Sequence, residues 1–162
     1  MPEPVAAFVA LGSNLDDPRS QVERGFDALS ALPDTRLRAR SRLFHTPPWG
    51  IVEQPDFINA VARIETSLAP RDLLAGLLDI ETRAGRVRGV ANGPRVLDLD
   101  LLLYGNAVID EPGLAVPHPR LHQRAFVLAP LADVAPDLDV PGRGRVRDLL
   151  ARVDAAACVP LA

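Results

Sequence analysis

The segment Phe57 to Ile64, FINAVARI, predicts the strand from which the rest of the fold can be worked out. Its even-numbered residues are all isoleucine or alanine, whereas the odd-numbered ones are phenylalanine, asparagine, valine and arginine. Alternate residues of a strand point to opposite faces, so one face belongs to the core and the other places Phe57 beside Asn59. A flat ring next to an amide that both donates and accepts hydrogen bonds would suit a planar polar heterocycle. An ordinary core position for Phe57 is the alternative.

The residues before this segment predict a strand, a helix and a second strand. Val5 to Leu11 is a short apolar run that ends in a Gly-Ser-Asn turn, which is typical of a buried strand. Asp17 followed by Pro18 indicates an N-cap with proline at the first helical position. Thr35 to Phe44 alternates arginine with smaller or apolar residues, which favours a half-exposed strand. A long loop from His45 to Asp56 would follow.

The residues after the segment predict a helix, a loop and further elements. Pro70 indicates a helix start, and the helix would run to about Gly85. Its apolar stripe would consist of Leu73, Leu74, Leu77 and Leu78. Arg86 to Pro94 has no period and is rich in glycine and proline, so it predicts a loop. The remaining expected elements are a strand, its short hairpin partner and a late helix, at Val96 to Tyr104, Ala107 to Ile109 and Val127 to Val134.

The order strand, helix, strand, strand, helix, strand is expected of a ferredoxin-like α+β sandwich, in which helices cover one face of a mostly antiparallel sheet. Extra C-terminal elements would follow this core. We find no internal repeat, linker or low-complexity segment, so we expect a single domain over residues 1–162. Such a fold does not by itself define a function.

Composition limits the classes of function. A chain of 162 residues with 48% apolar content can bury a real core, and a formal charge of −3 argues against a surface for nucleic acid or anionic membrane. All 18 basic residues are arginine, so anion recognition falls to guanidinium groups and bound metal. The single cysteine, Cys158, cannot form an internal disulfide, and we see no leader or membrane-spanning stretch. We therefore expect a cytoplasmic protein.

Asp98-Leu99-Asp100 is the sharpest chemical feature of the sequence. On a strand the two carboxylates project to the same face, while Leu99, Leu101 and Leu103 would enter the core. Two like charges this close repel unless a cation or proton lies between them, and oxygen ligands favour a hard ion such as Mg²⁺. For the pair taken alone, a strand whose polar face simply meets water is the alternative.

An arginine cluster directly precedes the aspartates. Arg86, Arg88 and Arg95 lie within ten residues of one another in a glycine-flanked loop. Guanidinium forks match phosphate oxygens bidentately, although a solvated charged loop would also explain the cluster taken alone. A carboxylate pair and arginines in one segment favour phosphoryl chemistry.

Other polar residues stand near these motifs. Glu81 continues the leucine stripe of the predicted helix, so it lies toward the sheet and needs a hydrogen-bonding partner, for which a nearby arginine is one candidate. His118 is held between two prolines in an extended segment, and Arg124 and Phe126 follow it. Thr46-Pro47-Pro48 predicts a rigid turn with exposed backbone groups, since proline donates no hydrogen bond.

Taken together, these stretches resemble the 6-hydroxymethyl-7,8-dihydropterin pyrophosphokinase family of the folate pathway. The resemblance spans roughly Val5 to Leu150, and the ferredoxin-like fold of that family agrees with the element order above. The motifs that carry it are Leu11-Gly12-Ser13-Asn14-Leu15, Thr46-Pro47-Pro48, Phe57-Ile58-Asn59-Ala60, Gly85-Arg86-Val87-Arg88, Gly93-Pro94-Arg95-Val96-Leu97-Asp98-Leu99-Asp100 and Val116-Pro117-His118-Pro119.

The resemblance implies transfer of the β,γ-diphosphate of ATP to the pterin hydroxymethyl group, with release of AMP. It implies two Mg²⁺ ions on Asp98 and Asp100, and these aspartates with Arg86 and Arg95 as the catalytic residues. It implies ATP contacts from Glu81, Arg86, Arg88, Arg95, His118 and Arg124. It implies pterin contacts from Thr46, Pro47, Pro48, Phe57, Asn59 and Phe126, with the two phenylalanines on either side of the ring.

The sequence departs from the family pattern in two places. The segment Gly89 to Asn92 is one residue shorter than in the best-known members, and Asn92 stands where they carry a tryptophan. Pro119 replaces a tyrosine beside the histidine. These departures concern loop closure and one phosphate contact rather than the class of reaction.

An RNA-binding module and a small-molecule sensor are the alternatives for such a fold. An RNA binder should show a basic face with exposed aromatics, whereas aromatic residues make up 4% of this chain. A pterin or nucleotide sensor would need the pocket but not the paired aspartates. We therefore expect a monomeric enzyme that acts on ATP and 6-hydroxymethyl-7,8-dihydropterin, without a nucleic-acid or membrane partner.

Overall fold

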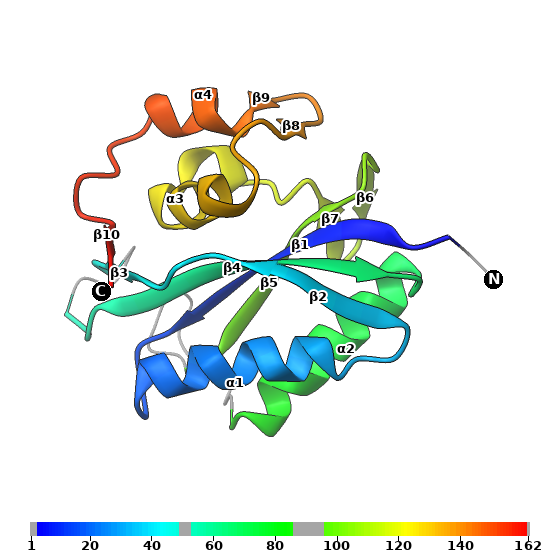
Figure 1. The fold of residues 1–162 in the computed structure, drawn as a ribbon, viewed down its shortest axis with the longest axis horizontal. Coiled ribbons are helices and arrows are strands. Elements are labelled where there is room, and N and C mark those ends of the chain that lie inside the picture. Colours follow the sequence, from blue (N-terminus) through cyan, green and yellow to red (C-terminus); the bar gives the residue numbers. More distant parts are fainter. Residues whose placement is uncertain (1–2, 49–52, 86–95, 162) are drawn as a thin grey trace.

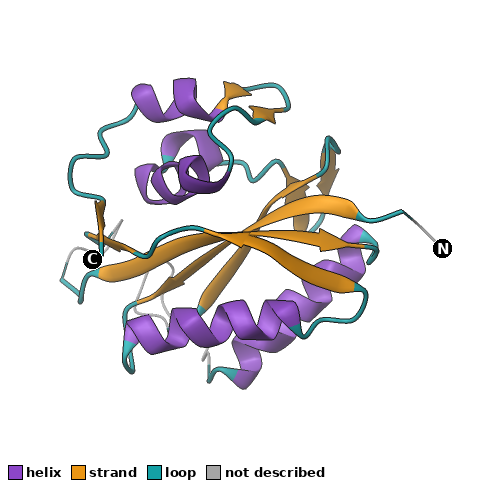
Figure 2. Ribbon diagram, viewed as in Figure 1, coloured by secondary structure: helices purple, strands orange, loops and turns teal. Residues whose placement is uncertain are grey.

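A central antiparallel sheet organises the protein (Figures 1 and 2), and the computed structural model describes residues 3–48, 53–85 and 96–161. Its strands follow the order β10-β3-β4-β1-β5, and β2 also pairs with β4. Their bounds are β1 (Val5–Ser13), β2 (Thr35–Arg40), β3 (Phe44–Thr46), β4 (Phe57–Thr66), β5 (Asp98–Tyr104) and β10 (Val159–Pro160). The expected α+β fold is confirmed.

Strand β4 is the centre of the sheet because both of its edges are paired. Strand β1 lies along one edge from Val5 opposite Thr66 to Ser13 opposite Ile58, and β2 and β3 follow each other along the other edge. The isoleucines and alanines of β4 belong to one hydrophobic cluster, whereas Val61 belongs to a second cluster on the opposite face. The predicted alternation of FINAVARI is therefore confirmed.

Two helices cover one face of the sheet, as Figure 1 shows. Helices α1 (Pro18–Ser30) and α2 (Pro70–Arg83) both begin with a proline, which suits a first turn whose N–H groups have no partner within the helix. The expected stripe of α2 is only partly correct, since Leu78 is 50% exposed. Ile80 and Glu81 complete the buried side of this helix instead.

The second face of the sheet is covered by the C-terminal part of the chain. Its elements are a short 3₁₀ helix (Leu121–Gln123), α3 (Ala125–Val134), β8 (Asp139–Val140), β9 (Gly144–Arg145) and α4 (Val146–Ala151). Helix α3 packs on the sheet and α4 lies over α3 (Figure 1), and their buried side chains form the second cluster with Phe8 and Val61. The predicted late helix is confirmed, although it begins at Ala125 rather than Val127.

The strand expected from Thr35 to Phe44 is wrong as a single strand. Strand β2 ends at Arg40, residues 41–43 leave the strand geometry, and the chain returns as β3 at Phe44. The pairing of β2 with β4 already shifts register between Leu37 and Ala39, so the alternation of arginines does not continue as one flat ladder. The loop expected from His45 consequently begins only after Thr46.

Strand β5 begins at Asp98, two residues later than predicted, and contains an irregularity. Its register against β1 shifts between Phe8, which lies opposite Leu103, and Val9, which lies opposite Leu101. Leu102 is therefore an extra residue, and such a bulge reverses the alternation after it. Leu103 enters the core as predicted, but on the other face from Leu99 and Leu101, because it joins the cluster on the α3 face.

The hairpin partner expected at Ala107 to Ile109 is also wrong. After β5 the amide of Gly105 donates to the carbonyl of Ala6 at 2.7 Å, and the chain turns away from the sheet. A separate two-stranded ladder follows, made of β6 (Ile109–Glu111) and β7 (Leu114–Val116). This β6–β7 hairpin lies beside the end of β5 and forms one wall of the cavity described below.

None of the helices in residues 3–48, 53–85 and 96–161 has the length and apolar character needed to cross a bilayer.

Candidate functional site

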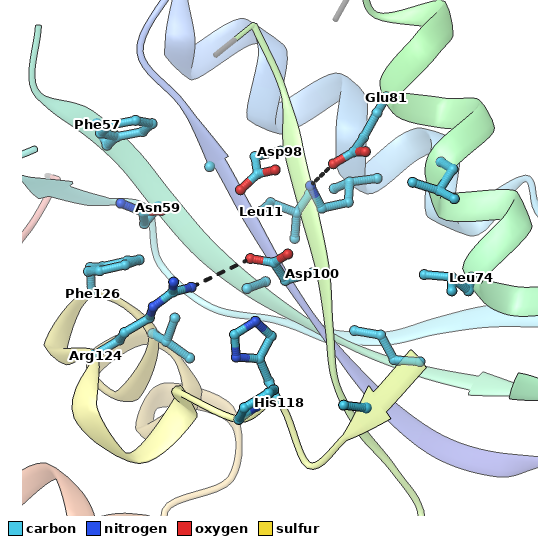
Figure 3. A pocket seen from close by; sticks show the side chains of 18 of the residues that line it. Leu11, Phe57, Asn59, Leu74, Glu81, Asp98, Asp100, His118, Arg124 and Phe126 are labelled. Atoms are coloured by element: carbon cyan, nitrogen blue, oxygen red, sulfur yellow. Dashed lines mark hydrogen bonds and ion pairs between the residues drawn. The ribbon is translucent and has the colours of Figure 1, made fainter. Parts of the chain in front are cut away.

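A cavity of about 520 Å³ lies around β5, the strand at one end of the sheet order (Figure 3). Its walls come from β1, β4 and β5, from α2 and α3, and from the β6–β7 hairpin. The structure brings together ten of the residues that the sequence analysis singled out, which are Thr46, Pro47, Phe57, Asn59, Glu81, Asp98, Asp100, His118, Arg124 and Phe126.

The acidic pair lies in the middle of this cavity. Asp98 and Asp100 are half-buried on β5, and Leu99 and Leu101 point from the same strand into the core beneath α1 and α2. Figure 3 shows both carboxylates turned into the cavity, and Arg124 Nη1 lies 3.9 Å from Asp100 Oδ2. The prediction that the two carboxylates share one strand face is confirmed.

The acidic pair has the donor atoms that magnesium prefers. In the part of the chain that the structure describes, no group of three or more His, Cys, Asp and Glu side chains could hold a metal ion on its own. Mg²⁺ is commonly bound through one or two carboxylates together with substrate phosphates and water, rather than by a cage of protein ligands. Asp98 and Asp100 therefore fit a metal that arrives with a nucleotide.

Glu81 ties α2 to the strand that carries the aspartates. Its side chain is only 3% exposed, and its Oε2 accepts a hydrogen bond from the backbone N–H of Leu99 at 2.7 Å. The prediction that this buried carboxylate needs a partner is confirmed, and one partner is the amide between the two aspartates. The bond fixes the start of β5 against the helix.

An aromatic and amide surface forms one end of the cavity. Figure 3 shows Asn59 with Phe57 and Phe126 near it, on the side of the acidic pair away from α2. Asn59 is buried and its Nδ2 donates to Thr46 Oγ1 at 2.6 Å. This bond fixes which way the amide faces, so Asn59 presents a defined set of donors and acceptors.

Gly12 on β1 is a contributor that the sequence analysis did not assign. A Cβ atom at Gly12 would lie 2.7 Å from Asn59 Oδ1, too close for a non-bonded contact, and 3.9 Å from the ring of Phe57. Gly12 also lines the cavity. Only the Leu-Gly-Ser-Asn turn marks this position in the sequence, because the contact depends on the pairing of β1 with β4.

His118 lies in the cavity as a neutral imidazole. Its backbone N–H donates to the carbonyl of Leu102 at 2.9 Å, and its Nδ1 accepts from the backbone N–H of Arg120 at 3.2 Å. Burial, with the positive charges of Arg124 and Arg120, lowers the pKa of His118 to about 4, although Asp98 opposes the shift. At neutral pH the ring therefore carries no charge and its Nε2 is the donor.

Arg124 brings a permanent positive charge to the same region. Burial lowers the pKa of its guanidinium, while Asp100 and Asp98 oppose that effect, and arginine stays protonated in either case. The guanidinium carbon lies 5.5 Å from the ring centre of Phe126. One cation thus lies close to both the acidic pair and the aromatic end.

Leucines form the opposite end of the cavity and were not predicted as site residues. This end is lined by Leu74 and Leu78 of α2 and by Leu114 and Ala115 of the β6–β7 hairpin. Leu74 lies on the α2 side of the acidic pair in Figure 3. The sequence carried no separate signal for this end, because Leu78 has the spacing of the apolar stripe and the hairpin was predicted in the wrong place.

Some predicted residues are not brought to this cavity by the described structure. Pro48 is half-buried but is not among the residues that line the cavity. Arg86, Arg88 and Arg95 lie outside the described residues, as does the segment 89–92.

A carboxylate pair and a guanidinium group in one cavity suit an enzyme that transfers phosphoryl groups with a metal ion. Residues 8–136 match the family described as 7,8-dihydro-6-hydroxymethylpterin-pyrophosphokinase (HPPK). The chain belongs to this family, and the resemblance noted in the sequence is confirmed.

Named relatives agree over most of the chain. A 2-amino-4-hydroxy-6-hydroxymethyldihydropteridine pyrophosphokinase of Pseudomonas aeruginosa is 52% identical over 144 residues, which cover 89% of this chain and 89% of that protein. An enzyme of the same name from Haemophilus influenzae is 44% identical over 146 residues, covering 90% of this chain and 91% of that protein. The protein is thus an enzyme, a pyrophosphokinase of folate biosynthesis.

Solved structures support the fold. A Plasmodium falciparum HPPK-DHPS triple mutant with STZ-DHP matches with a TM-score of 0.75 at 12% identity. The match covers 94% of this chain but only 44% of the Plasmodium chain, so this chain spans less than half of that protein. At this identity the likeness concerns the fold alone.

Proposed function

We propose that the protein transfers the β,γ-diphosphate of ATP to the hydroxymethyl group of 6-hydroxymethyl-7,8-dihydropterin, which leaves AMP. The observation that carries this proposal is the order of surfaces in one cavity, with an aromatic and amide end, a central acidic pair and an apolar end. The two substrates have parts in the same order, since a pterin ring, a chain of phosphates and an adenine ring would follow one another along the cavity.

The aromatic and amide end would take the pterin. The rings of Phe57 and Phe126 would lie on either side of its plane, and the amide of Asn59 with Thr46 would read its polar edge. The hydrogen bond between Asn59 and Thr46 supports this assignment because it holds the amide ready for a ligand. The backbone groups of Pro47 and Pro48 would complete the edge.

The leucine end would take the adenine of ATP. Leu74 and Leu78 of α2 and Leu114 of the hairpin line a gap of apolar character next to the carboxylates. A purine could be buried there while its phosphates extend toward Asp98 and Asp100. Glu81, His118 and Arg124 would contact the nucleotide between these two ends.

Asp98 and Asp100 would hold two Mg²⁺ ions that enter with ATP. Bound there, the metal neutralises phosphate charge and lowers the pKa of the attacking hydroxyl. The carboxylates themselves are held in place by β5 and by the bond from Leu99 to Glu81, so they need little rearrangement before the substrates arrive.

The chain's charged groups would act on the charge of the phosphate chain. In the reaction the hydroxymethyl oxygen forms a bond to the β-phosphorus and loses its proton, while the bond from that phosphorus to the α–β bridging oxygen breaks. AMP leaves with that oxygen. Arg124 and the neutral His118 would bind the α-phosphate side, and Arg86 and Arg95, with Arg88 nearby, would bind the transferring phosphates.

The test is AMP release from ATP that depends on added 6-hydroxymethyl-7,8-dihydropterin. Asp98→Asn and Asp100→Asn should each lower turnover by about 100-fold or more, because they weaken the metal site. Asp110→Asn changes an exposed aspartate of β6 that does not line the cavity, and it should match the wild type. Turnover that survives both cavity changes at saturating Mg²⁺ would overturn the assignment.

We also propose that residues 1–162 form one pterin pyrophosphokinase domain that acts as a monomer in the cytoplasm. Both hydrophobic clusters pack on the same sheet, which supports one folding unit. The large apolar side chains exposed in the described part are few, Leu78, Val108 and Val159, and belong to three different segments, α2, the turn before β6 and β10. Light scattering on the purified protein would test the monomer.

A further inference from the structure

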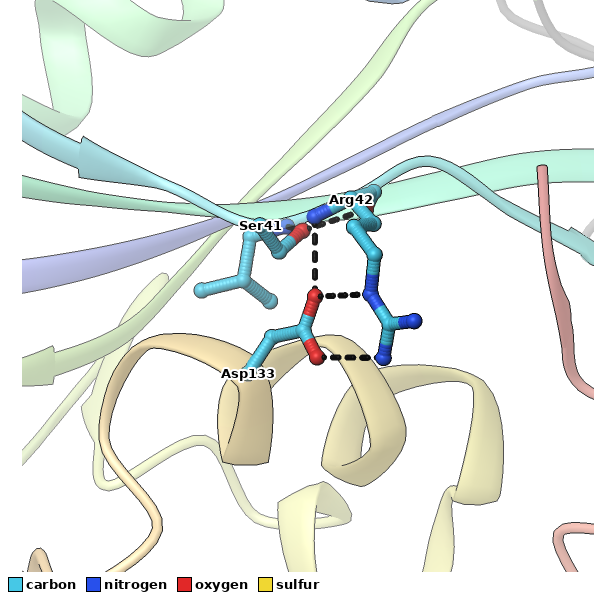
Figure 4. A network of polar contacts seen from close by, with 4 residues as sticks. Ser41, Arg42 and Asp133 are labelled. Carbon is cyan, nitrogen blue, oxygen red and sulfur yellow. Dashed lines mark hydrogen bonds and ion pairs between the residues drawn. The ribbon is translucent and has the colours of Figure 1, made fainter. Parts of the chain in front are cut away.

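An ion pair at the far end of α3 joins that helix to the sheet (Figure 4). Arg42 lies in the segment 41–43 between β2 and β3, and Asp133 lies in the last turn of α3. Arg42 Nε donates to Asp133 Oδ2 at 3.0 Å and Arg42 Nη2 donates to Asp133 Oδ1 at 2.9 Å. The backbone N–H of Arg42 also donates to Asp133 Oδ2 at 2.9 Å. We call this three-bond contact the Arg42–Asp133 clamp.

The sheet side of the clamp is fixed to β4. The amide of Ser41 donates to the carbonyl of Val61 at 2.9 Å, and the amide of Val61 donates back to Ser41 Oγ at 2.9 Å. Ser41 Oγ in turn donates to the carbonyl of Arg42 at 2.7 Å. Because Val61 lies in the middle of β4, the clamp connects α3 to the strand that begins with Phe57.

The clamp also reaches β3. The guanidinium carbon of Arg42 lies 5.5 Å from the ring centre of Phe44, which is two residues before Thr46. The clamp therefore connects the helix and the strands that carry the aromatic and amide end, from the last turn of α3. Thr46 and Asn59 lie on the strands, and Phe126 lies in the first turn of α3.

Helix α3 needs such a directional contact. Its buried side chains, Val127, Leu128 and Leu131, pack against the sheet, but apolar burial does not favour one direction of sliding over another. Pro130 inside the helix removes one backbone hydrogen bond as well. A bidentate guanidinium and carboxylate pair has a fixed geometry, so it can set where the helix sits.

We propose that Arg42 and Asp133 are positioning residues that hold Phe126 at the distance from Phe57 and Asn59 that a pterin requires. The inference rests on the proposed function, since it assigns the aromatic and amide end to the pterin. It predicts a larger effect on pterin binding than on nucleotide binding, because Arg124 adjoins α3 whereas the leucine end belongs to α2 and the hairpin.

The contact also affects the ionisation of both groups. The hydrogen bond to Arg42 lowers the pKa of Asp133, and the hydrogen bond to Asp133 raises the pKa of Arg42. Exposed ion pairs usually add little to the stability of a protein. We therefore expect the main effect of the three bonds to be on the position of α3 rather than on the free energy of unfolding.

The experiment compares Arg42→Ala, Asp133→Asn and the double variant by calorimetry with the pterin and by steady-state kinetics. Each single variant should raise the pterin Kd about five- to tenfold and KM for ATP by no more than about threefold, because Arg124 is the nucleotide contact that adjoins α3. The double variant should be no worse than the more affected single variant, because both changes remove the same contact. Arg42→Lys keeps the charge without the fork and should be intermediate.

The matched control is the pair Arg38 and Glu65, which joins β2 to β4 with Arg38 Nε 2.5 Å from Glu65 Oε2. It has the same charges on the same sheet but does not involve α3, so Arg38→Ala and Glu65→Gln should leave the pterin Kd unchanged. Val22→Ala, a buried change in α1, controls for lost stability on the opposite face. Thermal unfolding is measured on every variant.

Several outcomes would overturn the positioning role of the Arg42–Asp133 clamp. Equal losses of pterin and ATP binding, or the same pterin defect in Val22→Ala or Arg38→Ala, would show a structural role only. An unchanged pterin Kd in Arg42→Ala would show that apolar packing alone places α3. A wild-type protein that does not bind pterin would instead refute the proposed function, so the two failures are distinguishable.

Discussion

At the scale of single residues, the Asn59 amide depends on the absence of a side chain at Gly12. Gly12→Ala would place a Cβ atom 2.7 Å from Asn59 Oδ1, so the amide must move and its bond to Thr46 must weaken. We expect pterin binding to weaken by about 1–3 kcal/mol, the cost of leaving a buried polar group without its partner. Calorimetry with the pterin measures this loss.

A second glycine provides the control for this prediction. A Cβ atom at Gly76 of α2 would meet the tip of the flexible Leu32 side chain at 2.9 Å, and no polar group is among its three nearest contacts. Gly76→Ala should therefore change the stability of the protein but not the pterin Kd. A similar loss of pterin affinity in both variants would mean that Gly12 has no special relation to Asn59.

His118 predicts a pH dependence of stability. Its folded-state pKa of about 4 lies below the ordinary 6.5, so between these values the unfolded chain binds more protons than the folded one. The free energy of unfolding should fall as pH decreases from 6.5 to about 4 and then level off. With allowance for partial exposure to solvent, we expect about 1 kcal/mol from this group.

Urea unfolding at pH 7.5 and pH 5, for the wild type and His118→Gln, measures this contribution. The variant should lose less stability than the wild type between the two pH values. Asp133 titrates below its ordinary pKa of 3.8, outside the window, so it should not mask the difference. If the free energy of unfolding changed equally between pH 7.5 and pH 5 in the two proteins, His118 would not be buried as a neutral ring.

Two juxtapositions in the cavity could be predicted from the sequence because the spacing is local. Asp98 and Asp100 share a face since they are two apart on a strand, and the same rule placed Phe57 beside Asn59. Gly12 could not be predicted in this way, because its contact with Asn59 depends on the register between β1 and β4.

At the scale of elements, α2 and β5 are joined by one buried hydrogen bond. Glu81→Ala leaves the N–H of Leu99 without this acceptor, which should cost about 1–3 kcal/mol of stability. Because that amide lies between Asp98 and Asp100, turnover should fall as well. Glu81→Gln keeps an acceptor oxygen, so it should retain more of both properties than Glu81→Ala. Chemical unfolding and the AMP-release assay, run on both variants, would show whether this order is reversed.

The elements that the sequence predicted poorly are those whose partners are distant. The alternation in Thr35 to Phe44 suggested one strand, but Ser41 binds Val61 through both its backbone and its side chain and so ends the ladder. The bulge at Leu102 likewise depends on how β5 pairs with β1. Local patterns find strands, whereas irregularities within strands arise from the neighbour.

At the scale of the whole molecule, the order of elements was sufficient for the ferredoxin-like core but not for the second covered face. The pattern from Val127 to Val134 predicted a helix without indicating where it packs. Its position matters because α3 closes the cavity with Arg124 and Phe126. The function of the fold therefore depends on the segment whose placement was least evident from the sequence.

The C-terminal segment that forms β10 covers the outer edge of β3. Val159 pairs with His45, Pro160 pairs with Phe44, and the amide of Leu161 donates to the carbonyl of Leu43 at 2.8 Å. A variant cut after Ala157 would expose the outer edge of β3, and free strand edges are templates for contact with other chains. Light scattering on such a variant should show oligomers whose size increases with protein concentration. A variant that stays monomeric would show that the uncovered edge of β3 does not promote association.

We therefore expect the β10 segment to limit aggregation of the protein as well as to complete its sheet. A few residues, with a proline that presents no N–H group, occupy the edge next to the strand that carries Thr46. Aggregation and loss of pterin affinity should therefore appear together when this tail is released. In practice, the time for which the purified protein can be stored before it aggregates would depend on whether β10 stays paired with β3.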